Sequence, residues 1–82
     1  MARIIVERSF ATPLSDADLA SFGVPEHACR LIYRVTWKRT LLSEDRRRMI
    51  CEFEAPDAES VRRVQRQAGI EADRVWTADI IE

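Results

Sequence analysis

Alternating apolar and polar side chains predict a β-strand over residues 3–10. Ile4 and Val6 fall on one side of this strand, and Ile5 and Glu7 fall on the other, because successive side chains of a strand point to opposite faces. The β-branched residues at its start favour an extended backbone. We expect the side that carries Ile4 and Val6 to be buried.

The stretch from residue 11 to residue 34 has helical signals but a mixed periodicity. Ser15 and Asp16 mark a helix start, and Gly23 and Pro25 interrupt the helix that follows. Between residues 25 and 37 the apolar positions fit both the helical and the strand period, so periodicity leaves both open. We predict a second helical piece over residues 26–33, with Pro25 in its first turn, where a missing N–H group costs nothing.

Two strands over residues 35–42 and 47–54 are predicted to form a hairpin. The polar run at residues 43–46 separates them and is typical of a turn. Each strand has an apolar row, and both rows are expected to face one interior. The predicted inward-facing residues are Val35, Trp37, Leu41, Met49, Cys51 and Phe53.

The clearest helix is predicted between Asp57 and Gly69. Asp57 can cap the free N–H groups of the first turn, and Glu59 complements the positive end of the helix dipole. Gly69 supplies the left-handed stop. An apolar stripe recurs every 3 to 4 residues and is expected to be buried. Its members are Ala58, Val61, Val64 and Ala68.

A final strand is predicted over residues 74–81, with Trp76, Ala78 and Ile80 facing the interior. The order of elements is then βαββαβ. This order predicts an α+β, ferredoxin-like domain: a four-stranded antiparallel sheet with both helices on one face. The length of 82 residues allows one core, so residues 1–82 are expected to form a single domain.

The sheet face without helices is predicted to be half apolar. Such a surface is typically covered by a partner, which favours a homodimer. The apolar side chains expected on it are Ile5, Leu42, Ile50, Val75 and Ile81, and the charged ones are Glu7, Lys38, Glu52, Glu54 and Asp79.

The charge balance does not favour nucleic-acid binding. Thirteen basic and fourteen acidic residues nearly cancel, which leaves no overall field to attract phosphates. The arginine run at residues 46–48 would bind phosphate only if it shared a face with the helix arginines. The expected open face also lacks the aromatic pair on which single-stranded RNA binders of this topology stack bases.

The start of the chain has no targeting signal that we recognise. Arg3, Glu7 and Arg8 interrupt its apolar stretch, which therefore suits neither a signal peptide nor a membrane span. We expect a cytoplasmic protein with no membrane contact.

One cluster has the side chains of a metal site. Glu26, His27 and Cys29 stand close together, and imidazole with thiolate suits zinc, nickel or copper. The alternative is a surface or capping histidine beside a free cysteine. Cys29 and Cys51 have no paired spacing, so both are predicted to be free thiols.

Three carboxylates are expected on the open sheet face. Glu7, Glu52 and Glu54 would lie there as neighbours, where they could hold a divalent cation or form a catalytic pair. The alternative is a set of salt bridges, for example with Lys38 across the strands.

Part of the chain closely resembles a family of small proteins known as domain of unknown function forty-two forty-two. The resemblance lies in residues 48–62, RMICEFEAPDAESVR, and in the later segments at residues 67–69 and 72–75. The resemblance implies a ferredoxin-like fold and a tendency to dimerise. Some members are described as nickel-binding proteins, whose ligands are expected to be mainly histidines. This chain has one histidine, His27.

Two classes of function remain open. The first is a non-enzymatic homodimeric module that binds a ligand or a metal such as nickel, with His27 and Cys29 as metal ligands. The second is a small cofactor-independent enzyme of the oxygenase or isomerase kind, because that chemistry occurs on ferredoxin-like dimers. Its cleft would be lined by Tyr33, Trp37 and His27.

Overall fold

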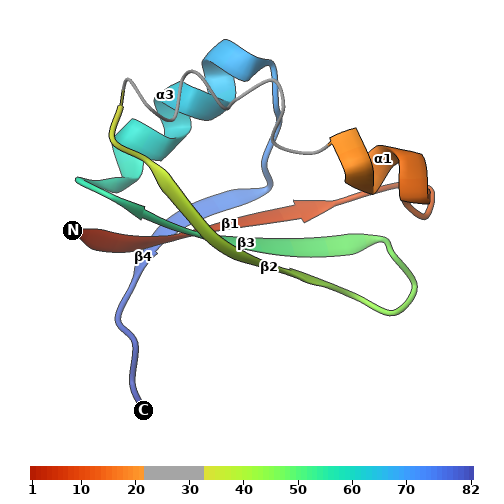
Figure 1. The fold of residues 1–82 in the computed structure, drawn as a ribbon, viewed down its shortest axis with the longest axis horizontal. Coiled ribbons are helices and arrows are strands. Elements are labelled where there is room, and N and C mark those ends of the chain that lie inside the picture. Colours follow the sequence, from red (N-terminus) through yellow and green to blue (C-terminus); the bar gives the residue numbers. More distant parts are fainter. Residues whose placement is uncertain (22–32) are drawn as a thin grey trace.

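The computed structural model describes residues 1–21 and 33–82. The elements follow the order β1 (Ala2–Ser9), α1 (Asp16–Ser21), β2 (Thr36–Leu42), β3 (Arg48–Ala55), α3 (Ala58–Ala68) and β4 (Arg74–Ala78). The strands form one antiparallel sheet in the order β2-β3-β1-β4, and α3 lies across one of its faces (Figure 1). The predicted ferredoxin-like fold is confirmed. The helical piece predicted over residues 26–33 falls outside the described residues, except for Tyr33, which lies in a turn.

The core lies between the sheet and α3. Ile4 and Val6 of the central strand β1 have no exposed surface, and Phe53 of β3 is 2% exposed. Val61 and Val64 of α3 pack against them. The alternation in β1 and β3 and the apolar stripe of α3 therefore each predicted residues of the same core.

A register shift in β2 changes which of its residues face the core. Trp37 lies opposite Phe53, but Arg39 lies opposite Glu52, so one residue of β2 is extra. Beyond this bulge every side chain of β2 has changed sides. Leu41, predicted to face inwards, therefore lies on the open face, and Leu42 lies on the helix side.

The two faces of β4 are the reverse of the prediction. Val75 lies opposite the buried Val6, and Trp76 lies opposite Ile5. Val75 consequently packs against the core, whereas Trp76 lies on the open face and is 45% exposed. The strand ends at Ala78, whereas the predicted strand continued to residue 81.

Ile80 also differs from the prediction, since it lies beyond β4 and is 55% exposed. Figure 1 shows the segment after β4 leaving the sheet on the side away from α3. Neither described helix has the length and hydrophobicity that a transmembrane segment requires.

Helix α3 has the ends that its sequence predicts. The Asp57 carboxylate accepts a hydrogen bond of 2.8 Å from the backbone N–H of Ser60, and Gly69 takes the left-handed conformation at φ 72°. The backbone hydrogen bond from Ser60 lowers the pKa of Asp57 below its ordinary value of 3.8. The Arg66 guanidinium, which donates to Glu59 over 2.7 Å, lowers the pKa of that carboxyl.

The cap predicts a pH dependence of stability. Because the pKa of Asp57 is lower in the folded chain than in the unfolded chain, its contribution is complete above pH 3.8 and is lost as the pH falls through the folded value. In Asp57→Ala we expect a lower Tm at pH 7 and a smaller deficit at pH 2 to 3. Thermal unfolding followed by circular dichroism at both pH values measures this difference.

Asp57→Asn is the matched control, because asparagine keeps the acceptor but cannot ionise. It should retain most of the stability at pH 7 and lose this part of the pH dependence. A deficit in Asp57→Ala that is the same at both pH values would contradict the role of the ionised cap.

Candidate functional site

The sheet face opposite α3 carries an open trough of about 640 Å³. Ile5, Ile50 and Trp76 contribute apolar surface to its lining. Lys38 and Arg39 of the edge strand β2 lie along one side, and residues 78–82 lie along the other. The predicted half-apolar open face is therefore present, although its members differ from the prediction: the bulge brings in Leu41, and the register of β4 brings in Trp76.

Charged side chains of the trough are paired with one another. Glu52 lies between Arg3, whose Nη1 is 3.0 Å from its Oε2, and Arg39, whose Nε is 3.1 Å from the same oxygen. Glu54 lies 3.7 Å from the Lys38 ammonium. These contacts favour the salt-bridge interpretation of the predicted carboxylate group over a catalytic pair.

Glu7 is held in a different way. Its Oε2 accepts a hydrogen bond of 2.8 Å from the indole N–H of Trp76 on the neighbouring strand. The indole N–H of Trp76 thus makes a hydrogen bond at the surface, while its ring contributes apolar surface to the trough.

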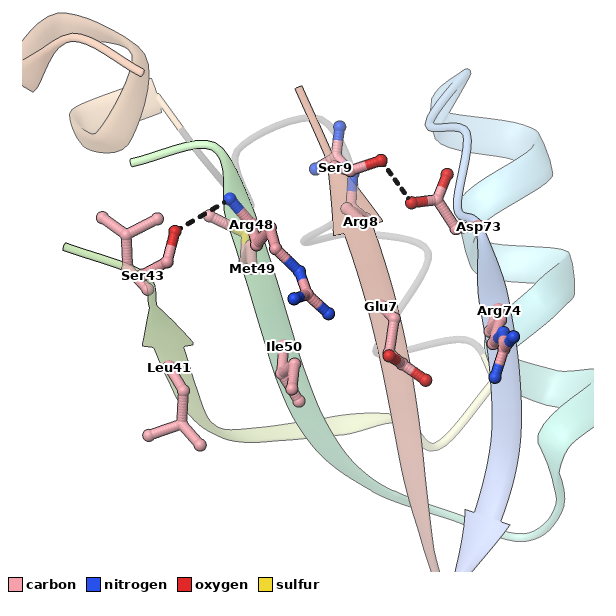
Figure 2. A pocket seen from close by; sticks show the side chains of 11 residues that line it. Glu7, Arg8, Ser9, Leu41, Ser43, Arg48, Met49, Ile50, Asp73 and Arg74 are labelled. Atoms are coloured by element: carbon pink, nitrogen blue, oxygen red, sulfur yellow. Dashed lines mark hydrogen bonds between the residues drawn. The ribbon is translucent and has the colours of Figure 1, made fainter. Parts of the chain in front are cut away.

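A second hollow of about 640 Å³ continues the open face towards the β2–β3 hairpin. Figure 2 shows Arg48 of β3 and Arg74 of β4 on either side of Glu7. Leu41 and Ile50 add apolar surface to this hollow. Among residues 1–21 and 33–82, neither of these two guanidinium groups forms an ion pair or a hydrogen bond.

Local hydrogen bonds fix the two ends of this hollow. Ser9 donates to Asp73 over 2.6 Å, which ties the end of β1 to the start of β4 (Figure 2). At the hairpin, the Ser43 hydroxyl donates to Asp45 over 2.6 Å and accepts from the backbone N–H of Arg48 over 3.0 Å. The hydrogen bond from Ser43 lowers the pKa of Asp45, so this carboxylate stays ionised at neutral pH.

The three arginines of the predicted run at residues 46–48 do not share one site. Arg46 forms an ion pair of 2.7 Å with Asp16, and Arg47 donates to the backbone oxygen of Phe10. Only the third residue, Arg48, lines the open-face hollow. A pair formed by Arg48 and Arg74 was not predicted, because the final strand had been assigned the opposite faces.

The predicted metal ligands His27 and Cys29, with Glu26, lie outside the described residues. Within residues 1–21 and 33–82, no three His, Cys, Asp or Glu side chains form a group that could hold a metal ion. Cys51 is half-buried, and its thiol accepts a hydrogen bond from Thr40 over 3.4 Å.

The enzyme-like cleft predicted at Tyr33, Trp37 and His27 is described only in part. The Tyr33 hydroxyl accepts a hydrogen bond of 2.7 Å from Gln67 of α3. Trp37 is 51% exposed and donates from its indole N–H to Thr40 over 2.9 Å. Trp37 is therefore a half-exposed residue of an edge strand, and its predicted place in the core is wrong.

Comparison with known proteins identifies the family. The model of the SCO4226-like family, described as nickel responsive protein SCO4226-like, matches residues 5–77. The chain belongs to this family. The crystal structure of SCO4226 from Streptomyces coelicolor A3(2) is similar at a TM-score of 0.86 and 20% sequence identity, over 99% of this chain and 100% of that chain. No curated protein sequence matches the chain significantly.

Membership of the SCO4226-like family confirms the resemblance noted from residues 48–62. The similarity to SCO4226 supports the βαββαβ fold of the sheet and its helices, and at 20% identity it supports the fold alone.

Proposed function

We propose that this chain is a non-enzymatic homodimeric binding module, and that two copies meet through the open face of the sheet. The observation that carries the proposal is the apolar surface left on that face. Trp76 is 45% exposed and lies opposite Ile5, and Leu41 is 52% exposed and lies opposite Ile50. A contiguous apolar surface rimmed by charged residues is typical of protein–protein contacts.

The charges at the rim suit a second copy of the same chain. Lys38 and Arg39 follow the β2 edge, and Asp79 and Glu82 follow the opposite edge. A two-fold axis parallel to the strands would place the basic edge of one copy over the acidic segment of the other, twice in each dimer. Such self-complementarity is what a two-fold interface requires.

The open face lies along one side of the molecule, which extends over 32 × 31 × 18 Å, and α3 lies on the other side of the sheet (Figure 1). A stable interface takes roughly 800 Å² from each partner, and the dimer would have to draw that area from the open face of the four strands and from residues 79–82. Two troughs brought together would enclose a shared space between the sheets.

Sedimentation equilibrium at protein concentrations from about 1 to 100 μM tests the oligomeric state. This range covers the dissociation constants of weak specific dimers. We expect twice the mass of the chain in the upper part of the range. A monomer at every concentration would refute the dimer.

A transition metal ion is the ligand suggested by the name of the family, which describes nickel responsive proteins. We propose that His27 and Cys29 supply an imidazole and a thiolate to such an ion. Both are donors that nickel accepts, and a complete site would need further ligands, for instance from the second copy. The exposed acids of the described residues do not substitute for them, because no group of three forms among residues 1–21 and 33–82.

Calorimetry with Ni²⁺ on untagged protein, stripped of metal with a chelator, tests this site. The parent should give a saturable heat, and His27→Ala should abolish it, since removing an imidazole removes the principal ligand. Cys51→Ala is the matched thiol control, because Cys51 belongs to the sheet; it should bind as the parent does. No heat in the parent, or an unchanged heat in His27→Ala, would rule out the site.

A further inference from the structure

We infer that the hollow beside the β2–β3 hairpin binds the carboxylate of a small amphipathic organic acid, with Arg48 and Arg74 as its charge partners. This inference rests on the proposed function, because it gives the binding module a second ligand besides the metal ion proposed at His27 and Cys29. The hollow holds about 640 Å³ and lies open at the end of the sheet face. Its entrance would therefore stay at the margin of two paired sheets.

The two arginines are distinguished by the donors that they leave unused. Several other arginines have carboxylate partners: Arg3 and Arg39 bind Glu52, and Arg46 binds Asp16. Within the described residues, the guanidinium groups of Arg48 and Arg74 form no ion pair or hydrogen bond, although the charge of Arg48 contributes to the lowered pKa of Asp45. A guanidinium has five N–H donors in a planar fork, a geometry that matches the two oxygens of a carboxylate.

The carboxylates of the hollow are engaged elsewhere. Glu7 accepts from the Trp76 indole at 2.8 Å, and Asp73 accepts from the Ser9 hydroxyl at 2.6 Å. The third arginine of the lining, Arg8, donates to the backbone oxygen of Glu71 over 3.1 Å. Three arginines and two carboxylates give the lining a formal charge of +1, which favours a monoanion over a dianion such as phosphate.

Apolar side chains give the site its preference for an amphipathic acid. Leu41 and Ile50 lie directly opposite each other on β2 and β3, on the same face as the two arginines. Leu41 is 52% exposed, so a hydrocarbon chain would remove its surface from water. The carboxylate of such a ligand would lie on the open side of Glu7, within reach of the two arginines, and its chain would lie along Leu41 and Ile50.

Titration of the isotope-labelled chain with hexanoate, followed by amide NMR shifts, tests the inference. We expect saturable shifts at Leu41, Ile50 and Arg74. Hexanamide, which has the same chain without the charge, should bind at least about tenfold more weakly, as should Arg48→Gln and Arg74→Gln with hexanoate, because each loses charged hydrogen bonds. Arg63→Gln, an exposed change on α3, is the matched control and should bind as the parent does.

Equal binding of hexanamide and hexanoate, tighter binding of inorganic phosphate, or unchanged binding in both arginine variants would overturn the inference. Sedimentation of the same samples separates it from the dimer. A dimer that does not respond to hexanoate contradicts only the anion site. A monomer that binds hexanoate at these residues contradicts only the dimer.

Discussion

Replacing Ile50 by glutamate is expected to convert the dimer into a monomer. Ile50 lies on β3, in the lining of both open-face hollows, opposite Glu7 and Leu41. A carboxylate there would replace apolar surface of the proposed interface and would lie opposite Glu7 on the neighbouring strand. Arg48 lines the same hollow and would offset part of the added charge. Burying a charge that is only partly compensated costs about 3 kcal/mol, which weakens pairing by roughly a hundredfold.

Sedimentation equilibrium of Ile50→Glu and of the parent measures this change. Ala20→Glu adds the same charge to α1, where Ala20 is exposed, and it should remain dimeric. Circular dichroism should show that both variants keep the fold, because Ile50 faces away from the core. Dissociation in Ala20→Glu as well, or none in Ile50→Glu, would show that the interface lies elsewhere.

Replacing Phe53 by alanine is expected to remove most of the stability of the domain. Phe53 is 2% exposed and packs with Ile4, Val6 and Val64 at the centre of the core. Loss of a buried phenyl ring costs about 3 to 5 kcal/mol, because the transfer energy is lost and a cavity remains. A domain of this size has about 4 to 12 kcal/mol in total.

Urea unfolding at one fixed protein concentration measures the loss, since pairing also contributes to the observed stability. Phe53→Leu keeps most of the volume and should cost only about 1 kcal/mol. A midpoint for Phe53→Ala within experimental error of the parent would mean that this core is not the one that holds the fold.

Much of the fold could be predicted because its central elements have unambiguous periods. In β1, Ile4 and Val6 share one face, and Arg3 and Glu7 lie with Ile5 on the other, on a strand with neighbours on both sides. In α3, the cap at Asp57 and the stop at Gly69 both follow from the chemistry of single residues. Local sequence and tertiary packing agree at these positions, so the sequence alone identifies them.

The edge strands could not be predicted in full because their faces depend on register. In β2, one extra residue between Trp37 and Arg39 moves Leu41 to the open side, and no turn residue marks the bulge. In β4, both faces contain apolar residues, so the alternation alone does not show which face is buried, and the face with Trp76 was wrongly assigned to the core. The register of β4 with β1 determines which face is buried, because it places Val75 opposite Val6 on the core side.

The candidate site follows from these same registers. Arg48 and Arg74 are far apart in the sequence and come together only because β3 and β4 both flank β1. A group of carboxylates near Lys38 was predicted, but the two arginines that enclose Glu52 were not. The pairing of Glu7 with Trp76 likewise required the observed orientation of β4.

Intermolecular NOEs between an isotope-labelled copy and an unlabelled copy test the open-face interface most directly. The account predicts NOEs between copies from the methyl groups of Ile5 and Ile50 and from the indole ring of Trp76. Contacts between copies that arise only from α3, or none under conditions where the protein sediments as a dimer, would contradict it.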